Sequence, residues 1–219
     1  MKTIAINGSP KLKDSLSGQI IGQMEKILGE HIKIHHAAKL VRDGAAPDSL
    51  RDLLSADTLL IVFPLYVDSL PAPLIEFLTR LERAKGGPAP LRVFAIANCG
   101  FIEPKQIEPA LEMIKHFADC AGLQWGYGLG IGGGPLLGNF GNNWNTGPIS
   151  GIHNALCDMA SAILESRSGQ DVFISAKFPR FLYKTLANMG WSVQARKNGI
   201  KAASLRARPY AVREKHISI

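Results

Sequence analysis

The segment after the first apolar run carries hydroxyl groups and a positive charge at spacings that suit a phosphate. Ser9 and Lys11 follow a turn at Gly8, and Ser15 and Ser17 lie where a helical pattern begins. The first N–H groups of a helix are unpaired and carry partial positive charge, so these side chains predict an anion-binding segment. The alternative is structural, because a serine at a helix start commonly caps the helix. The segment is not a P-loop, since its sequence lacks the pattern G-x-x-x-x-G-K-[ST].

Two further segments could hold a flat ring. Pro64, Leu65, Tyr66 and Val67 place an aromatic ring and aliphatic side chains beside a turn, where a planar apolar ligand would find a surface and backbone groups for its polar edge. Tyr66 could instead only cover the end of a sheet. Together with the anion-binding segment, this pattern predicts a mononucleotide with a large heterocycle.

The third segment consists of Asn98, Cys99 and Gly100, again with turn residues and backbone groups that we expect to be free. Cys99 could be redox-active, although a cysteine in such a place more often is a small, half-buried packing residue.

A parallel sheet would bring these three segments together. The apolar runs at residues 57–63 and 91–97 are continuous, which is typical of strands buried on both faces. Strand and helix patterns alternate along the chain, so we predict βαβ units with helices on both faces and a ligand site at the carboxyl ends of the strands. The expected strands are 2–7, 31–36, 57–63, 91–97 and 125–131, and the expected helices are 15–28, 47–54, 71–83, 107–121 and 149–166.

Composition limits the class of protein. The chain has 219 residues, of which 46% are hydrophobic and 20% charged, as in ordinary globular proteins, and this excludes disorder and coiled coil. It contains neither a membrane-length apolar run nor a signal-peptide pattern. Its three cysteines include no C-x-x-C, so we expect no disulfide framework, no metal and a cytoplasmic location.

The net charge of +7 is concentrated at the C-terminus. Residues 170–219 carry ten Lys and Arg but only two acidic residues, so we divide the chain into a domain at 1–169 and a basic extension at 170–219. An amphipathic basic helix at 179–191 could lie on anionic lipid, but packing on the domain or on a second subunit is the favoured interpretation. Nucleic-acid binding has the charge but no aromatic–basic module.

The opening I-N-G-S-P-K-x-x-x-S-x-S and the later F-P-L-Y, with a proline-led helix after it, resemble NAD(P)H-dependent FMN reductases and related flavodoxin-like quinone reductases. The resemblance covers roughly residues 1–135. It implies a flavodoxin-like α/β fold, with a five-stranded parallel sheet in the order 2-1-3-4-5 and the basic extension added. It also implies a homodimer.

The same resemblance implies FMN as cofactor and NAD(P)H as co-substrate. Ser9, Lys11 and residues 15–17 would surround the phosphate, residues 64–67 would line the isoalloxazine, and residues 98–100 would lie at its far edge. Lys11 stands where Arg is common, Leu16 where Asn is frequent, and Leu65 where a polar or small residue is usual.

The implied activity is transfer of hydride from NAD(P)H through the flavin to a quinone, a flavin or a similar acceptor. The flavin would carry the chemistry without a catalytic acid or base, and Tyr66 is the candidate substrate contact. A non-enzymatic electron carrier or partner-binding protein is the alternative, as is a fold that has lost FMN. The glycines at 128–133 spell G-x-G-x-x-G, but Pro135 follows where a dinucleotide fingerprint needs a helix. We expect this stretch to keep the backbone close to the flavin.

Overall fold

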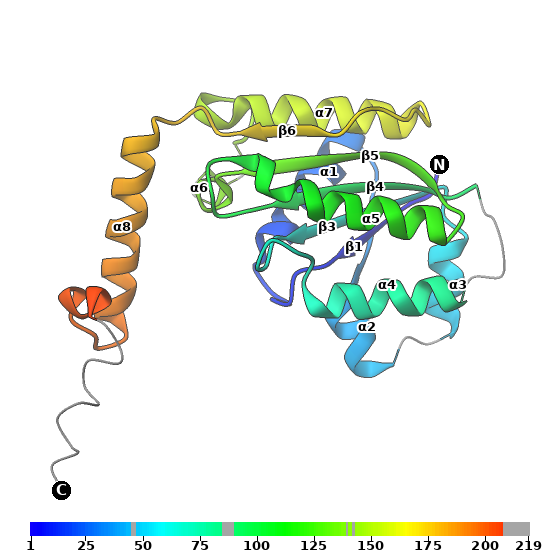
Figure 1. Ribbon diagram of the computed structural model, residues 1–219. Coiled ribbons are helices and arrows are strands. Elements are labelled where there is room, and N and C mark those ends of the chain that lie inside the picture. The colour runs from blue at the N-terminus through cyan, green and yellow to red at the C-terminus, as the bar shows by residue number, and fades with distance from the viewer. Residues whose placement is uncertain (45–46, 85–89, 139, 142, 208–219) are drawn as a thin grey trace, which may run out of the picture. The chain divides into compact units, whose positions relative to one another are not determined.

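The computed structural model describes residues 1–44, 47–84, 90–138, 140–141 and 143–207. It divides the chain into two compact units, Met1–Lys177 and Phe178–Ile219 (Figure 1). The first unit therefore extends eight residues beyond the boundary expected from charge alone.

The first unit is built on a sheet of six parallel strands in the order β2-β1-β3-β4-β5-β6. The predicted order 2-1-3-4-5 is confirmed, but the prediction of five strands is wrong. The sixth strand has only four residues, too few to show a strand period, although Val172, Phe173 and Ile174 are residue types favoured in strands. The strands are β1 Thr3–Asn7, β2 Lys33–His36, β3 Thr58–Pro64, β4 Arg92–Asn98, β5 Gln124–Gly132 and β6 Val172–Ser175.

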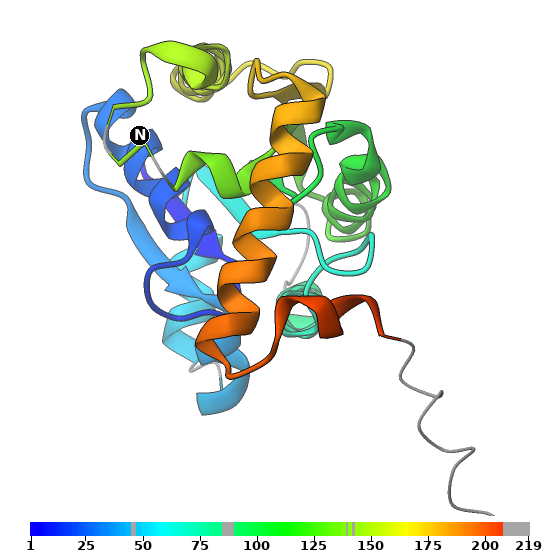
Figure 2. The ribbon, with the colours of Figure 1, turned by 90° about the vertical axis from the view of Figure 1, so that its left-hand side faces the viewer.

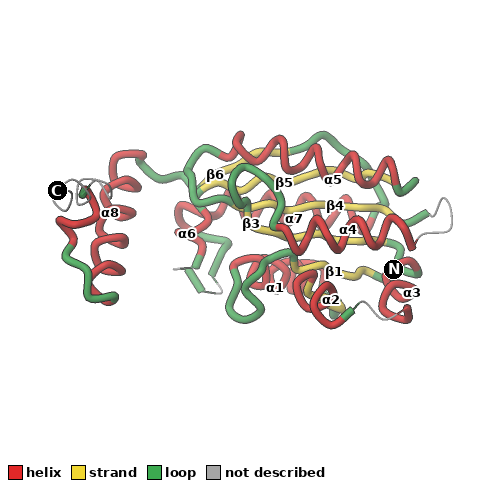
Figure 3. The backbone as a smooth tube through the Cα atoms, turned by 60° about the horizontal axis from the view of Figure 1, so that its bottom comes forward, coloured by secondary structure: helices red, strands yellow, loops and turns green. Residues whose placement is uncertain are grey.

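Helices cover both faces of this sheet, as predicted (Figures 1 and 3). One face carries α1 Leu16–Leu28 and α7 Ser150–Leu164. The other carries α2 Ala37–Asp43, α3 Pro47–Leu54, α4 Ala72–Ala84 and α5 Glu108–Cys120. Shorter helices occur at α6 Gly134–Leu137, Pro104–Ile107 and Gly147–Ile149. Sequence periodicity missed α2 and α6 because seven and four residues are too few to show a helical period.

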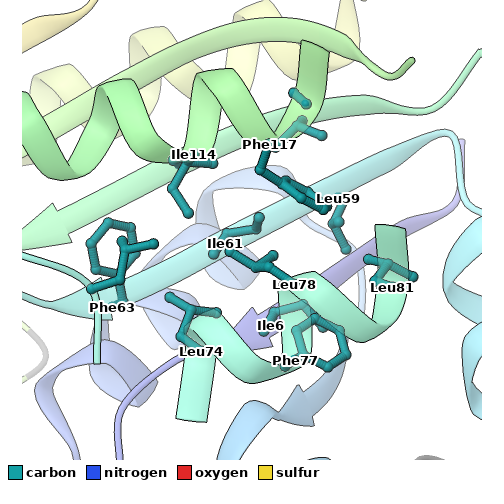
Figure 4. Packing of buried hydrophobic residues seen from close by; sticks show 14 of the residues in the cluster. Ile6, Leu59, Ile61, Phe63, Leu74, Phe77, Leu78, Leu81, Ile114 and Phe117 are labelled. Atoms are coloured by element: carbon teal, nitrogen blue, oxygen red, sulfur yellow. The ribbon is translucent and has the colours of Figure 1, made fainter. Parts of the chain in front are cut away.

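The core consists of two apolar layers separated by the sheet. Strand β3 supplies both, because successive side chains of a strand point to opposite faces. Leu59, Ile61 and Phe63 pack with α4 and α5, as Figure 4 shows, while Leu60 and Val62 pack with α1 and α7. The continuous apolar run at this strand therefore reflects burial on both faces.

The second unit contains α8 Arg180–Lys197 and a 3-10 helix, η3 Ala202–Arg206. The predicted helix at 179–191 is present, but it begins one residue later and ends six residues later. It ends where Gly199 adopts a left-handed φ of 73° and the Ile200 N–H donates to the Ala195 carbonyl at 2.9 Å, the hydrogen bond of a Schellman cap. The basic residues beyond 207 lie outside the described residues. Among the described residues, no helix combines the length and the apolar character needed to cross a bilayer.

Candidate functional site

A cavity of about 320 Å³ opens at the edge of the sheet where the strands end, the edge that Figure 2 faces. The chain leaves β1 for β2 on one side and returns to β3 on the other, so this is the topological switch point at which such sheets bind ligands. The loops after β1, β3 and β5 all contribute to the wall. The lining residues are Ser9, Lys11, Asp14, Ser15, Leu16, Ser17, Gln19, Pro64, Tyr66, Gly134, Pro135 and Gly138.

Asn7, the last residue of β1, holds the first loop in shape. Its side chain is buried; Oδ1 accepts from the Ser9 N–H at 3.0 Å, and Nδ2 donates to the Ser15 Oγ at 3.1 Å. The amide thus joins the strand end to the start of α1. Sequence reasoning did not select Asn7, although a polar residue ending an otherwise apolar strand was a signal that could have found it.

The start of α1 presents hydrogen-bond donors to the cavity. Ser15 is the N-cap, and its Oγ accepts from the Gly18 N–H at 3.1 Å, so the structural interpretation of this serine is correct. Ser17 is 1% exposed, and its Oγ has no hydrogen-bond partner among the described residues. A buried hydroxyl without a partner is costly in a folded protein. In addition, the first helical N–H groups, at Leu16 and Ser17, have no intrahelical acceptor.

Charged side chains of both signs lie at the rim of this part of the cavity. The ammonium of Lys11 donates to the Asp14 carbonyl at 3.0 Å, and Asp14 itself turns the chain with a left-handed φ of 50°. Sequence reasoning did not identify Asp14 or Gln19 as lining residues. The negative charge of the Asp14 carboxylate disfavours binding of an anion here. The positive charges of the Lys11 ammonium and of the helix N-terminus favour it.

The loop after β3 contributes Pro64 and Tyr66 to the wall, and the Tyr66 side chain is half exposed. Two reciprocal hydrogen bonds of 3.0 Å between Tyr66 and Ser69 close a tight turn. Leu65 packs partly into the core and Val67 is 97% exposed, so neither predicted residue lines the cavity.

The loop after β4 lies beside the wall instead of lining it. The Asn98 Nδ2 donates to the Phe63 carbonyl at 3.0 Å, and the Cys99 carbonyl accepts from the Gly134 N–H at 2.8 Å. Neither these two residues nor Gly100 belongs to the cavity lining. Burial raises the pKa of the Cys99 thiol, which favours its interpretation as a packing residue.

Backbone groups that we expected to be free are used within the fold, and that expectation is wrong. The N–H groups of Leu65, Tyr66 and Cys99 donate to carbonyls of the protein at 2.8, 3.0 and 3.0 Å. Hydrogen bonding of these amides depends on which loops meet at the sheet edge, and no single segment of sequence shows this.

The glycine-rich segment supplies the remaining wall. Within β5 the glycines serve packing, since a Cβ on Gly126 would lie 2.6 Å from the Phe94 ring. After β5, Gly133 has a φ of 74° and turns the chain into α6, where Gly134, Pro135 and Gly138 line the cavity. The expectation that Pro135 prevents a helix after this G-x-G-x-x-G is wrong, because α6 begins at Gly134 with Pro135 in its first turn, a position that proline tolerates. The helix has only four residues.

The arrangement has the chemistry of a site for a phosphate-bearing planar ligand. Ser9, Ser15 and Ser17 bring hydroxyls, and the helix N-terminus brings N–H groups, to one end of the cavity. The buried Ser17 hydroxyl is the observation that fits FMN, because a phosphate oxygen would supply the missing acceptor. No three His, Cys, Asp or Glu side chains of the described chain gather closely enough to hold a metal ion.

The parallel sheet beginning 2-1-3-4-5, with a cavity at the β1/β3 switch point, defines a flavodoxin-like fold. The sequence matches no family model and no curated protein. Solved structures with the same fold do exist, and they include members of the family that the motifs resemble.

Three of these structures cover about three quarters of this chain. An NADPH-quinone reductase from P. pentosaceus is 16% identical with a TM-score of 0.53, over 74% of this chain and 96% of that one. An NADH:FMN oxidoreductase, EmoB, is 17% identical with a TM-score of 0.56, over 75% and 89%. General stress protein 14 from Treponema denticola, in complex with FMN, is 12% identical with a TM-score of 0.54, over 73% and 99%. At these identities the likeness establishes the fold.

Proposed function

We propose that the chain is an FMN-dependent oxidoreductase that takes hydride from NAD(P)H and reduces a quinone, a flavin or a similar small acceptor. The observation that carries the proposal is the buried, unpartnered hydroxyl of Ser17, at a helix N-terminus in the switch-point cavity; no described residue bonds it. The names of the structures with this fold, a quinone reductase, an NADH:FMN oxidoreductase and an FMN complex, support the proposal.

The two ends of the cavity would hold different parts of the cofactor. Pro64 and Tyr66 would flank the ring, with the Gly134 backbone on the other wall. A Cβ at Gly134 would lie 3.0 Å from the Cys99 carbonyl oxygen, so a side chain at this position would crowd the loop after β4. The phosphate would be held by the N–H groups of α1 and by Ser9, Lys11, Ser15 and Ser17.

When bound, FMN would accept hydride from a reduced nicotinamide and pass the electrons to a second substrate. The protein's part is to orient both partners and to limit access of water. Tyr66, half exposed at the rim, is placed to stack against the second substrate. The proposed reaction needs no general acid or base from the protein, and we assign none.

The test is a visible spectrum of the full-length protein loaded with FMN, recorded anaerobically. The proposal predicts that NADPH or NADH bleaches the flavin bands and that a quinone restores them. Flavin bands that neither nucleotide bleaches would instead favour an electron carrier. Tyr66→Ala should raise KM for the quinone when it is assayed at saturating FMN, and Val67→Ala, outside the cavity lining, is the control.

A further inference from the structure

The second unit has almost no core of its own. Among its described residues, 178–207, Ala195 is the single buried one. Exposed apolar groups of this number are unusual on a protein surface and mark an interaction site. The large apolar side chains left exposed are Phe181 at 73%, Leu182 at 38%, Leu186 at 43%, Met189 at 59%, Trp191 at 69%, Val193 at 49%, Ile200 at 47% and Leu205 at 51%.

Four of these side chains form a stripe along one side of α8. Leu182, Leu186, Met189 and Val193 are spaced by four, three and four residues, which places them on one helical face. All four are exposed, so within the second unit no described residue covers this stripe.

The other side of α8 faces η3, which lies beside the C-terminal half of the helix (Figure 2). Between the two helices is a cavity of about 660 Å³ lined by Trp191 and Leu205, with Arg206 as its charged group. The unit therefore presents apolar surface and positive charge together.

The charge of the described part of this unit has one sign. Residues 178–207 contain six Lys and Arg and no Asp or Glu, and the unit's single acidic residue, Glu214, lies outside the described residues. The first unit, residues 1–177, has 16 basic and 17 acidic residues, a balance of −1. Any partner that covers the exposed apolar stripe must also accept a dense positive charge.

We propose that the described part of the second unit, residues 178–207, binds the surface of a bilayer that contains anionic phospholipid. The aliphatic stripe would enter the boundary between headgroups and acyl chains, and the basic residues would lie at the phosphates. This inference is independent of the proposed reaction, because it uses no residue of the switch-point cavity.

Positive charge and exposed apolar side chains together favour a lipid surface over a second copy of the chain or a nucleic acid as the partner of this unit. Pairing of α8 with α8 of a second copy would bring together helices without a single acidic residue. A nucleic acid satisfies the charge through its phosphates but leaves the stripe of Leu182, Leu186, Met189 and Val193 uncovered.

The test is co-sedimentation of the full-length protein with vesicles of phosphatidylcholine, with or without about 30% phosphatidylglycerol. We expect the protein to pellet with the anionic vesicles only, and to be released at about 0.5 M salt, where screening is strong. Pelleting with both kinds of vesicle, or with neither, would overturn the proposal.

Matched variants separate this surface from general stickiness. Leu186→Ser/Met189→Ser should reduce the vesicle-bound fraction at least tenfold, whereas Ile75→Ser/Leu164→Ser, exposed apolar positions of the first unit, should leave it unchanged. Circular dichroism of each variant shows whether the helices remain.

A charge series tests the electrostatic part. Arg196→Gln/Lys197→Gln/Lys201→Gln should weaken binding on the order of a hundredfold. The control Lys105→Gln/Lys115→Gln/Arg167→Gln removes the same charge from exposed positions of the first unit, and it should have little effect.

Two other results would also overturn the proposal. The first is a dimer mass by light scattering that is lost in Leu186→Ser/Met189→Ser, without vesicle binding by the wild type; the surface would then belong to a second copy. The second is a gel shift with duplex DNA in the absence of vesicle binding.

Discussion

Ser15 and Ser17 lie two residues apart at the start of α1, yet the protein uses them differently. The Ser15 Oγ accepts from both the Gly18 N–H and the Asn7 Nδ2, so it contributes to the fold. The Ser17 Oγ is buried, and no described residue forms a hydrogen bond with it. Its removal should therefore not lower the stability of the fold. The proposed phosphate site would give this hydroxyl a hydrogen-bond partner.

The two serines therefore give opposite predictions. Ser17→Ala should leave the melting temperature unchanged or raise it, and should weaken FMN binding by about 1.5–3 kcal/mol, the range for a hydrogen bond to a charged group. Ser15→Ala should lower the free energy of unfolding by about 1 kcal/mol, as for a lost N-cap. Thermal melts and fluorescence titrations measure both quantities. A Ser17→Ala protein that melts early yet binds FMN normally would remove this assignment.

Cysteine reactivity should follow burial. Cys99 is buried and its thiol pKa is raised, so the reactive thiolate is scarce, whereas Cys120 is exposed on α5. In the native protein, iodoacetamide should label Cys120 rapidly and Cys99 only on the time scale of unfolding. Mass spectrometry of tryptic peptides measures this order. Equal labelling rates would show that Cys99 is accessible and would reopen a redox role for it.

At the scale of elements, the long strands and helices could be predicted because their apolar patterns are long enough to have a period. The expected strand at 57–63 is observed at Thr58–Pro64, and the expected helix at 15–28 at Leu16–Leu28. Strand β6 escaped prediction because its place is set by pairing with β5 and by the Asp171 carboxylate, which accepts from the Gly128 N–H at 2.6 Å.

The candidate site was predictable where it depends on local sequence. Ser9, Ser17 and Tyr66 all line the cavity, as the turn and helix-start patterns suggested. The sequence could not show how the loops contact one another. Asn98 is held by the Phe63 carbonyl and Gly134 by the Cys99 carbonyl, and both contacts join residues about 35 positions apart in the chain.

The turn after β3 is strained. Val67 and Asp68 have left-handed φ angles of 49° and 56°, and a β-branched residue rarely adopts this conformation. Such two-residue turns favour Asn and Gly. Val67→Asn should therefore raise the free energy of unfolding by about 1 kcal/mol, because it relieves strain at a side chain that makes no cavity contact.

Chemical denaturation measures that change, with Val67→Ile as the control that keeps the β-branch. The asparagine variant should retain the wild-type affinity for FMN, since Val67 is absent from the cavity lining. A loss of stability in Val67→Asn would mean that the turn is not strained in solution.

At the scale of the whole molecule, the unit boundary is itself testable. The structure ends the first unit at Lys177, after β6, whereas charge alone placed the boundary before residue 170. Phe173 and Ile174 of β6 pack against the two core layers, so removal of this strand exposes apolar surface on both faces of the sheet edge.

A fragment of residues 1–177 should fold and bind FMN like the full chain, because every residue of the cavity lies within it. The free energy of unfolding of a fragment of residues 1–169 should be about 2–4 kcal/mol lower than that of the 1–177 fragment, because Phe173 and Ile174 are no longer there to be buried. Denaturant titration compares the two. Equal stability of the fragments would mean that β6 contributes nothing to the first unit.

The central claim is that the cavity holds a flavin by its phosphate, and titration of the purified apoprotein with FMN and with riboflavin tests it most directly. Riboflavin has the same ring but no phosphate, so it cannot bond the N–H groups and serine hydroxyls of the first loop. We predict one FMN per chain, bound about a hundredfold or more tighter than riboflavin. Equal affinities, or no binding of either flavin, would contradict the account.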